Sequence, residues 1–296
     1  MDNKIKITII IIIGLFALSW IVASFFSGAS FGNVALIKIN GVIMPESGGI
    51  LSSGTVSSSD IVDLMDSAEK DDSIKGILLE IDSPGGSPVA SAEIADAVKN
   101  SNKTVVAWIR ESGTSGAYWA ASPAYKIVAH PLSITGSIGV IGSYLDYAGL
   151  LDRFNISYER LVSGNYKDIG SPYKELTPDE RASLQKTIDI MHEYFVQSVA
   201  ENRNMSVESV RKLANGKFYL GMEAKNLGLV DFLGGKDVAE EIIKKRENLT
   251  EVNLVEYKKK TGFIESLAGM FNGIGFYFGE GVSRGLVEQN SLSVKV

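Results

Sequence analysis

Short runs of β-branched residues alternate with helix-like segments along the first half of the chain. The runs cover residues 34–39, 77–81, 105–109 and 126–129. Helical patterns fall between them, at residues 60–70, 89–99 and 116–121. A strand, helix, strand order at this spacing is typical of βαβ units. The sequence therefore predicts an α/β fold that is built on a mainly parallel sheet.

The N-terminal segment departs from this pattern. Residues 7–26 contain no charged side chain, and a helix of this length spans about 30 Å, the thickness of a bilayer core. Lys4 and Lys6 precede the segment and the next basic residue is Lys38, so the positive-inside rule predicts a cytoplasmic N-terminus and an extracytoplasmic remainder. We expect a retained single-pass anchor in the cell membrane. A cleaved signal peptide and a buried core helix are the alternatives.

Charge and composition exclude several functional classes. A net charge of −6 gives no sign of the basic face that a nucleic-acid partner requires. The absence of cysteine excludes disulfides, thiolate nucleophiles and cysteine-ligated metals. His130 and His192 are the two histidines available as catalytic bases.

The first candidate site is the glycine turn Pro84-Gly85-Gly86, which follows a predicted strand. It leads into a predicted helix with Ser87 as its cap and Pro88 at its first position. An ordinary type II turn is the structural alternative. In the functional interpretation, the glycines let backbone N–H groups approach a ligand at a helix N-terminus. The turn is therefore a candidate oxyanion hole, whereas a phosphate loop is disfavoured because no Gly-Lys-Ser/Thr follows.

The second candidate is Ser115, which lies at a predicted strand-to-helix corner where a hydroxyl can be exposed as a nucleophile. The α/β-hydrolase pattern G-x-S-x-G needs glycine at position 117, and this chain has Ala117. A helix cap is the structural alternative. A serine nucleophile needs a base, but His130 follows only fifteen residues later and His192 lies within a predicted long helix.

A lysine can replace histidine where burial disfavours its ammonium form. Lys167, in SGNYKDIGSP, has aromatic and apolar neighbours that could wall it in. A solvated loop charge is the structural alternative. Ser137, in TGSIGVIGSY, could hydrogen-bond the lysine amine and orient its lone pair, with a glycine-permitted strand or tight loop as the structural alternative.

The second half of the chain carries further helical signals. The motif Thr177-Pro178-Asp179-Glu180 supplies a capping box and predicts a long helix. The buried stripe that we expect on this helix comprises Leu184, Ile188, Met191, Phe195 and Val199. A short helix at 206–214 and a charged helix at 236–247 should follow. The glycine- and serine-rich residues 48–59 predict a mobile loop.

Four segments taken together, DSPGG, TSGAYWAASPAYKIVA, TGSIGVIG and SGNYKDIGSPYKELT, resemble the signal peptide peptidase A (SppA) family in order and spacing. This family, peptidase family S49, comprises membrane-anchored Ser/Lys peptidases. The resemblance covers residues 34–245. It implies a Clp-protease/crotonase-like α/β fold, a superhelix of repeated β-β-α units, with an N-terminal transmembrane helix.

The resemblance implies a role for each of six residues: Ser115 as nucleophile, Lys167 as general base, Ser137 as the residue that positions the base, Gly86 and Gly116 as oxyanion-hole donors, and Gly85 as the residue that shapes the turn. The family often has Ser-Gly-Gly-Tyr at the nucleophile, so Ala117 puts the pocket shape in question. No metal or organic cofactor is implied. Single-length members assemble into rings whose sites take serine and lysine from neighbouring subunits, so we expect a homo-oligomer whose monomer is inactive.

We therefore expect a membrane-anchored serine endopeptidase that hydrolyses signal-peptide remnants or other unfolded, membrane-proximal peptides. A non-catalytic membrane scaffold and a crotonase-type acyl-CoA enzyme are the alternatives. The expected organisation is an anchor at 1–28, a peptidase domain at 29–257, and an apolar, glycine-rich tail at 258–296 to which the sequence assigns no role.

Overall fold

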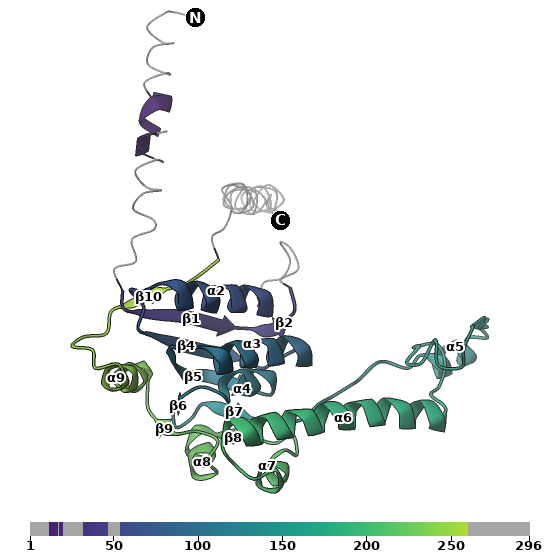
Figure 1. The fold of residues 1–296 in the computed structure, drawn as a ribbon. Coiled ribbons are helices and arrows are strands. Elements are labelled where there is room, and N and C mark those ends of the chain that lie inside the picture. Colours follow the sequence, from purple (N-terminus) through teal and green to yellow (C-terminus); the bar gives the residue numbers. More distant parts are fainter. Residues whose placement is uncertain (1–11, 17, 20–31, 47–53, 260–296) are drawn as a thin grey trace, which may run out of the picture. The chain divides into compact units, whose positions relative to one another are not determined.

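The computed structural model describes residues 12–16, 18–19, 32–46 and 54–259 (Figure 1). The chain divides into two compact units, Met1–Tyr257 and Lys258–Val296, and only the first is described below. Most of the predicted anchor at 7–26 and nearly all of the predicted tail lie outside the described residues. Within the described ranges, no helix is both long enough and apolar enough to cross a membrane.

A largely parallel sheet forms the centre of the first unit. Its strands run in the order β10-β1-β4-β5-β6-β9, and every neighbouring pair along this path is parallel. The bounds of these strands are Val34–Asn40 (β1), Gly76–Ser83 (β4), Thr104–Thr114 (β5), Lys126–Ala129 (β6), Phe232–Leu233 (β9) and Leu254–Glu256 (β10). The predicted α/β class and the predicted strands are thereby confirmed.

Two pairs of short strands complete the architecture. Strand β7 (Ile134–Gly136) pairs in parallel with the end of β5 and antiparallel with β8 (Phe218–Leu220). Strands β2 (Val42–Met44) and β3 (Thr55–Ser57) form a separate parallel ribbon. The predicted loop at 48–59 is therefore wrong for its last residues, because Val56 packs against the core and β3 pairs with β2.

Helices cover both faces of the sheet (Figure 1). The helices are α2 (Ser58–Lys70), α3 (Pro88–Asn100), α4 (Gly116–Ala121), α5 (Ala148–Arg153), α6 (Pro178–Asn202), α7 (Val207–Leu213), α8 (Gly221–Asn226) and α9 (Lys236–Arg246). One core cluster joins the sheet to α2, α3 and α4, and a second joins its other face to α9. Both faces of the strands are consequently apolar, and Asp82 is the one residue of β4 that is not fully buried.

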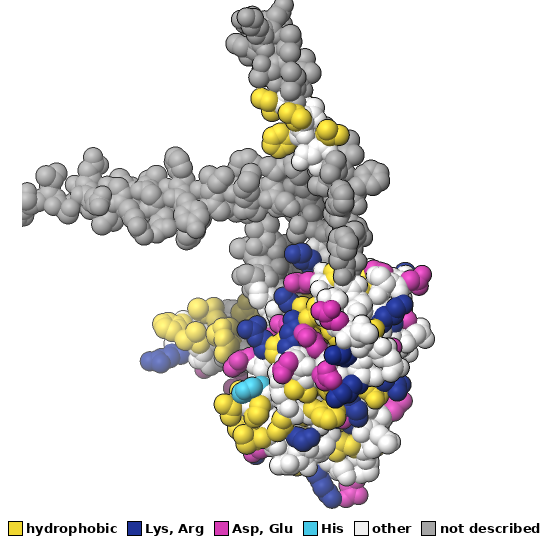
Figure 2. All heavy atoms as spheres, turned by 90° about the vertical axis from the view of Figure 1, so that its left-hand side faces the viewer, with side chains coloured by type: hydrophobic (Ala, Val, Ile, Leu, Met, Phe, Trp, Pro, Cys, Tyr) yellow, Lys and Arg dark blue, Asp and Glu magenta, His cyan; other side chains and the backbone are white. Residues whose placement is uncertain are grey.

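The surface over α9 and β10 carries charges of both signs, interspersed with one another (Figure 2). Lys38 pairs with Glu256 at 3.1 Å and Lys126 with Asp231 at 3.6 Å. Exposed pairs of this kind contribute about 0–1 kcal/mol each to stability. This surface therefore behaves as an ordinary solvated face of the sheet layer.

The long helix α6 begins as its sequence predicts. Thr177 Oγ1 accepts a hydrogen bond from the Glu180 amide, and the Glu180 carboxylate accepts one from the Thr177 amide. The prediction of one continuous buried stripe is wrong, however, because Met191 is 41% exposed whereas Phe195 and Val199 are buried. Only the second half of α6 contributes residues to the core, and the first half extends beyond the sheet layer (Figure 1).

An aromatic contact ties α6 to α4. The Phe195 ring stacks on the Trp119 ring with centroids 4.6 Å apart and planes inclined by 13°. The Trp119 indole N–H also donates to Ser198 Oγ at 2.8 Å. Since α4 follows directly after Ser115, this contact fixes the long helix next to the candidate nucleophile.

Truncating Phe195 should test the importance of this contact. We expect Phe195→Ala to lower the free energy of unfolding by about 3–5 kcal/mol, because it leaves a cavity against Trp119. The matched control is Ile190→Ala on the same helix, whose side chain is 62% exposed and whose loss should cost about 0.5 kcal/mol or less. Denaturant unfolding measures both, and equal losses would show that α6 is not anchored through Phe195.

Candidate active site

Ser115 is the single residue between the end of β5 and the start of α4. Its backbone has φ 53° and ψ −125°, a conformation that is rare and strained for a residue with a side chain. Two hydrogen bonds hold it there: the Ser115 amide donates to the Gly136 carbonyl at 2.8 Å, and the Ser115 carbonyl accepts from the Trp119 amide at 3.0 Å. The strained corner directs the serine away from both regular elements.

The glycine turn after β4 is held against β2. Gly85 has φ +97°, as a Pro-Gly turn predicts. The Ile43 amide donates to the Gly85 carbonyl at 2.9 Å, and the Ser87 amide donates to the Ile43 carbonyl at 2.8 Å. A Cβ atom on Gly86 would lie 1.9 Å from the Ile43 carbonyl oxygen. Ser87 is the N-cap residue of α3 as predicted, although its side chain makes no capping hydrogen bond.

Two backbone N–H groups meet beside Ser115. A Cβ atom built on Gly85 would lie 2.7 Å from the Gly116 nitrogen and 2.9 Å from Ser115 Cβ, and one built on Gly116 would lie 3.3 Å from the Gly86 nitrogen. Among the described residues, neither the Gly86 nor the Gly116 amide donates to a protein acceptor. Paired, unused N–H donors next to a serine hydroxyl have the arrangement that an oxyanion hole requires.

The pairing of β5 with β7 brings a second serine to the same place. Thr114 is opposite Gly136 in this register, so Ser115 and Ser137 are the next residues of the two strands. Ser137 also has a positive φ, 50°, and its hydroxyl donates to the Gly216 carbonyl at 3.3 Å. Ser115 and Ser137 line a common hollow of about 530 Å³.

The middle of α6 forms one wall of this hollow. The helix residues that line it are Gln185, Ile188, Asp189 and His192. Sequence reasoning missed their role, although their spacing of three and four residues places them on one helical face. His192 is engaged by backbone, with its Nε2 2.8 Å from the Ala214 carbonyl oxygen. His130 is exposed and its Nδ1 accepts a hydrogen bond from the Leu132 amide at 3.2 Å.

A smaller pocket of about 100 Å³ also has Ser115 in its lining. Its apolar lining comes from Trp119, Val140, Ile141 and Phe195, and the backbone of Gly86 and Gly116 completes it. The aromatic residues that anchor α6 therefore also shape the space next to the candidate nucleophile. A small apolar side chain matches the size and lining of this pocket.

Lys167 lies elsewhere in the chain. It belongs to a segment, residues 143–176, that we call the arm; the arm contains α5 and lies beyond the N-terminal end of α6 (Figure 1). The Lys167 side chain is exposed and lines neither of the two cavities around Ser115. The structure thus brings Ser115, Ser137, Gly86 and Gly116 together, and does not bring Lys167 to them within one chain.

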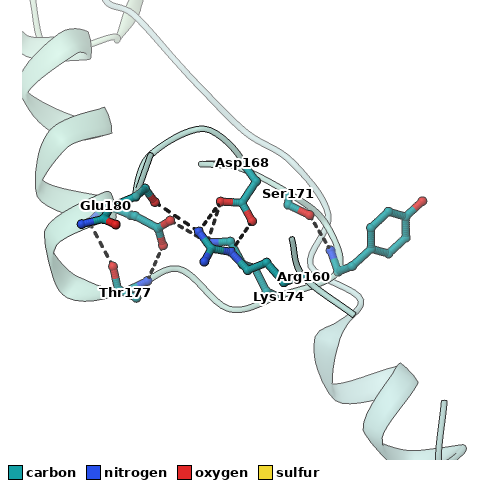
Figure 3. Close-up of polar contacts among 8 residues, drawn as sticks. Arg160, Asp168, Ser171, Lys174, Thr177 and Glu180 are labelled. Atoms are coloured by element: carbon teal, nitrogen blue, oxygen red, sulfur yellow. Dashed lines mark hydrogen bonds and ion pairs between the residues drawn. The ribbon is translucent and has the colours of Figure 1, made fainter. Parts of the chain in front are cut away.

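A network of four charges fastens the arm to the start of α6 (Figure 3). Arg160 donates to both carboxylate oxygens of Asp168, at 2.6 and 2.7 Å, and Lys174 donates to Glu180 at 2.6 Å. The hydrogen bonds from Arg160 hold the pKa of Asp168 below its usual range, and the hydrogen bond from Lys174 lowers the pKa of Glu180. Because Glu180 also closes the capping box, the network joins the arm to the helix itself.

Comparisons with known proteins agree with this geometry. The family described as Peptidase family S49 matches residues 97–251. A relative in Methanocaldococcus jannaschii, named as a candidate protease, is 39% identical over 229 residues, which are 77% of this chain and 72% of that one. A relative in Enterococcus faecium, named as a candidate signal peptide peptidase SppA, is 34% identical over 247 residues, 82% of this chain and 72% of that one. The chloroplastic serine protease SPPA of Arabidopsis thaliana is 29% identical over 249 residues, 82% of this chain and 36% of that one.

An α/β sheet that ends in a strained serine beside two unused amides fits a serine-type hydrolase. The family match and the protease relatives show that the class is a serine-type peptidase. The chain belongs to peptidase family S49 and, within it, to the SppA peptidases. Of the alternatives that the sequence left open, these findings support the peptidase and not the acyl-CoA enzyme.

The glycine turn offers a direct test of the site. In Gly86→Ala the new methyl group would collide with the Ile43 carbonyl, so the turn would have to shift and the Gly86 amide would lose its present position relative to the Gly116 amide. We expect hydrolysis of a fluorogenic peptide to fall by about 100-fold or more, the usual loss for one oxyanion-hole donor. The control is Lys245→Ala in α9, whose side chain is 76% exposed and lines neither cavity around Ser115. Wild-type turnover in Gly86→Ala would contradict this arrangement of the amides.

Proposed function

We propose that this chain is a membrane-anchored endopeptidase in which Ser115 is the nucleophile and Lys167 the general base. The observation that carries the proposal is the strained Ser115 corner beside the unused amides of Gly86 and Gly116. Strain of this kind persists only where the surrounding structure enforces it, and it is concentrated at active sites. The lone alternative for Ser115, a helix cap, lacks support because its side chain makes no capping hydrogen bond.

We also propose a specific fold within the α/β class and a location at the membrane. We assign the domain to the Clp-protease/crotonase-like superhelix of β-β-α units, in keeping with its consecutive parallel strands and intervening helices. The uncharged residues 7–26 are proposed to be a single-pass membrane anchor with a cytoplasmic N-terminus. The catalytic domain is then extracytoplasmic.

The base is proposed to come from a neighbouring copy of the chain. Lys167 is exposed on the arm and lines neither cavity next to its own Ser115. The arm also exposes large apolar side chains, each more than half accessible: Leu145, Leu150, Phe154, Ile156 and Leu161. An exposed apolar surface of this extent is typical of a surface that another protein covers. A closed ring of copies would let each arm reach the Ser115 hollow of the next subunit.

The chemistry follows from these positions. The neutral amine of Lys167 removes the proton of the Ser115 hydroxyl as the serine oxygen bonds to the substrate carbonyl carbon. The oxyanion that forms accepts hydrogen bonds from the Gly86 and Gly116 amides. Collapse breaks the C–N bond, and the ammonium of Lys167 protonates the leaving amine. Water, deprotonated by the same lysine, then attacks the acyl carbon; the bond to the Ser115 oxygen breaks, and the lysine returns the proton to that oxygen. Ser137 is proposed to orient the lysine amine.

The proposed substrates are signal-peptide remnants or other unfolded peptides near the membrane. The apolar pocket of about 100 Å³ next to Ser115 suits a small apolar side chain of such a peptide. The Enterococcus relative is named for the same substrate class.

Mixing two inactive variants should test the shared site. We expect Ser115→Ala and Lys167→Met each to abolish hydrolysis of a fluorogenic peptide without unfolding the domain. When the two are co-assembled, about one quarter of the subunit boundaries in random rings would pair an intact serine with an intact lysine. Activity should therefore return to about a quarter of the wild-type value.

The outcomes of this experiment separate the parts of the proposal. Full activity in either single variant would remove that residue from the mechanism. Co-assembled particles that contain both variants and remain inactive would contradict a site shared between subunits. Particles made from either variant alone are the matched controls.

A further inference from the structure

We propose that Arg160 and Asp168 are positioning residues whose ion pair keeps a carboxylate away from the amine of Lys167. The inference rests on the proposed function, in which Lys167 must lose its proton to act. It concerns a pair of residues that contact neither the substrate nor Ser115 in the proposed mechanism.

The sequence places a carboxylate on the residue that follows the lysine. Three successive turns, closed by amide-to-carbonyl hydrogen bonds, compact the chain around Lys167: Lys167 to Gly164 at 3.1 Å, Ile169 to Tyr166 at 3.2 Å and Ser171 to Asp168 at 3.0 Å. Asp168 is the next residue after the lysine. A carboxylate within about 4–6 Å of a lysine favours its charged form, which is the wrong form for a base.

Arg160 donates a hydrogen bond to each oxygen of that carboxylate. Its Nε and Nη2 atoms donate to the two oxygens of Asp168, and Nη2 also donates to the Asn165 carbonyl at 3.2 Å. The planar fork of a guanidinium matches a carboxylate in this two-point geometry and fixes its direction. The Asp168 side chain is only 14% exposed, and Figure 3 shows it turned toward Arg160 and Lys174.

The remaining charged groups near this turn come from the end of the arm and the start of α6. Lys174 donates to Glu180 and lies 4.0 Å from an oxygen of Asp168, so the network contains two cations and two anions. Glu175 and Asp179 are the other charged residues of the hollow next to it, which Lys167 does not line. The Lys167 amine itself makes no ion pair or hydrogen bond with any described residue. The ion pair therefore keeps the carboxylate that follows Lys167 in the chain bound to a cation, while Glu175 and Asp179 stay on the hollow that Lys167 does not line.

Opposite shifts in the pH profile should reveal this role. In Arg160→Gln the Asp168 carboxylate is released beside Lys167, so the ascending limb of kcat/KM should move to higher pH by about half to one unit. In Asp168→Asn the cation of Arg160 remains unbalanced, so the limb should move to lower pH. The double variant Arg160→Gln/Asp168→Asn removes both charges and should return the limb to its wild-type position.

The experiment uses the full chain in its assembled form, with hydrolysis of a fluorogenic peptide followed from pH 6 to 10. At the middle of the limb, Arg160→Gln should lose about two- to fivefold in kcat/KM and recover at high pH. The matched control is Arg211→Gln, which breaks a second arginine–carboxylate pair, between α7 and α6, in which Nη2 of Arg211 donates to both oxygens of Glu193 at 2.7 and 2.9 Å. The ascending limb of the kcat/KM profile of this variant should stay at the wild-type pH.

A merely structural pair would lower activity equally at every pH, and the double variant would be no better than the singles. Limbs that stay in place, or that move in the same direction in both single variants, would overturn the inference. Should Arg160→Gln fail to fold, the downward shift in Asp168→Asn decides alone. The proposed base is tested separately by Lys167→Met, whose activity at any pH would contradict the dyad rather than the ion pair.

Discussion

The site depends on the register of β5 with the strands on either side of its last residues. Ser83 is paired with Gly113 on one side, and Thr114 is paired with Gly136 on the other. Because parallel strands end at a common edge, these pairings bring three loops together: the glycine turn after β4, Ser115 after β5 and Ser137 after β7. A shift of one residue in either pairing would separate the nucleophile from the two amides or from the second serine.

Two residues at the ends of these strands have a strained backbone. Ser115 and Ser137 both have positive φ, and each such conformation costs of the order of 1–3 kcal/mol. Backbone hydrogen bonds hold both in place: the Ser115 amide donates to Gly136, and the Ser137 amide donates to the Lys217 carbonyl at 2.9 Å. Because Gly86 has no side chain, the glycine turn can lie directly against the backbone of Ile43. The backbone around Ser115 therefore holds the candidate nucleophile and the two free amides in fixed positions.

The helices and strands could be predicted from residues close together in sequence, whereas the site is formed by pairing between strands that are distant in sequence. The capping box at Thr177 and the apolar strands could be predicted because their causes lie within a few residues. The apolar run of β5 ends at Ile109, yet the strand continues to Thr114, because β4 and β7 pair with its polar end. Two features of α6 could not be predicted for a similar reason: its first half is exposed, and its middle lines the hollow next to Ser115. Helical periodicity does not specify what a helix packs against. The motif order of the family supplied Ser137, which its own sequence surroundings left as an ordinary loop residue.

Lys167 illustrates the limit of local reasoning. Its aromatic neighbours suggested an apolar wall, but Tyr166 and Tyr173 are each about half exposed and do not bury it within one chain. Loss of the lysine proton is favoured by removal from water and opposed by nearby carboxylates. In the proposed mechanism the arm itself meets the second requirement for Asp168, because Arg160 binds that carboxylate. The first requirement would be met only when another surface covers the exposed apolar arm. In the mechanism proposed, assembly therefore brings Lys167 close to Ser115 of the next subunit and removes its amine from water. Peptidase activity then depends on the ring, and the isolated chain is inactive.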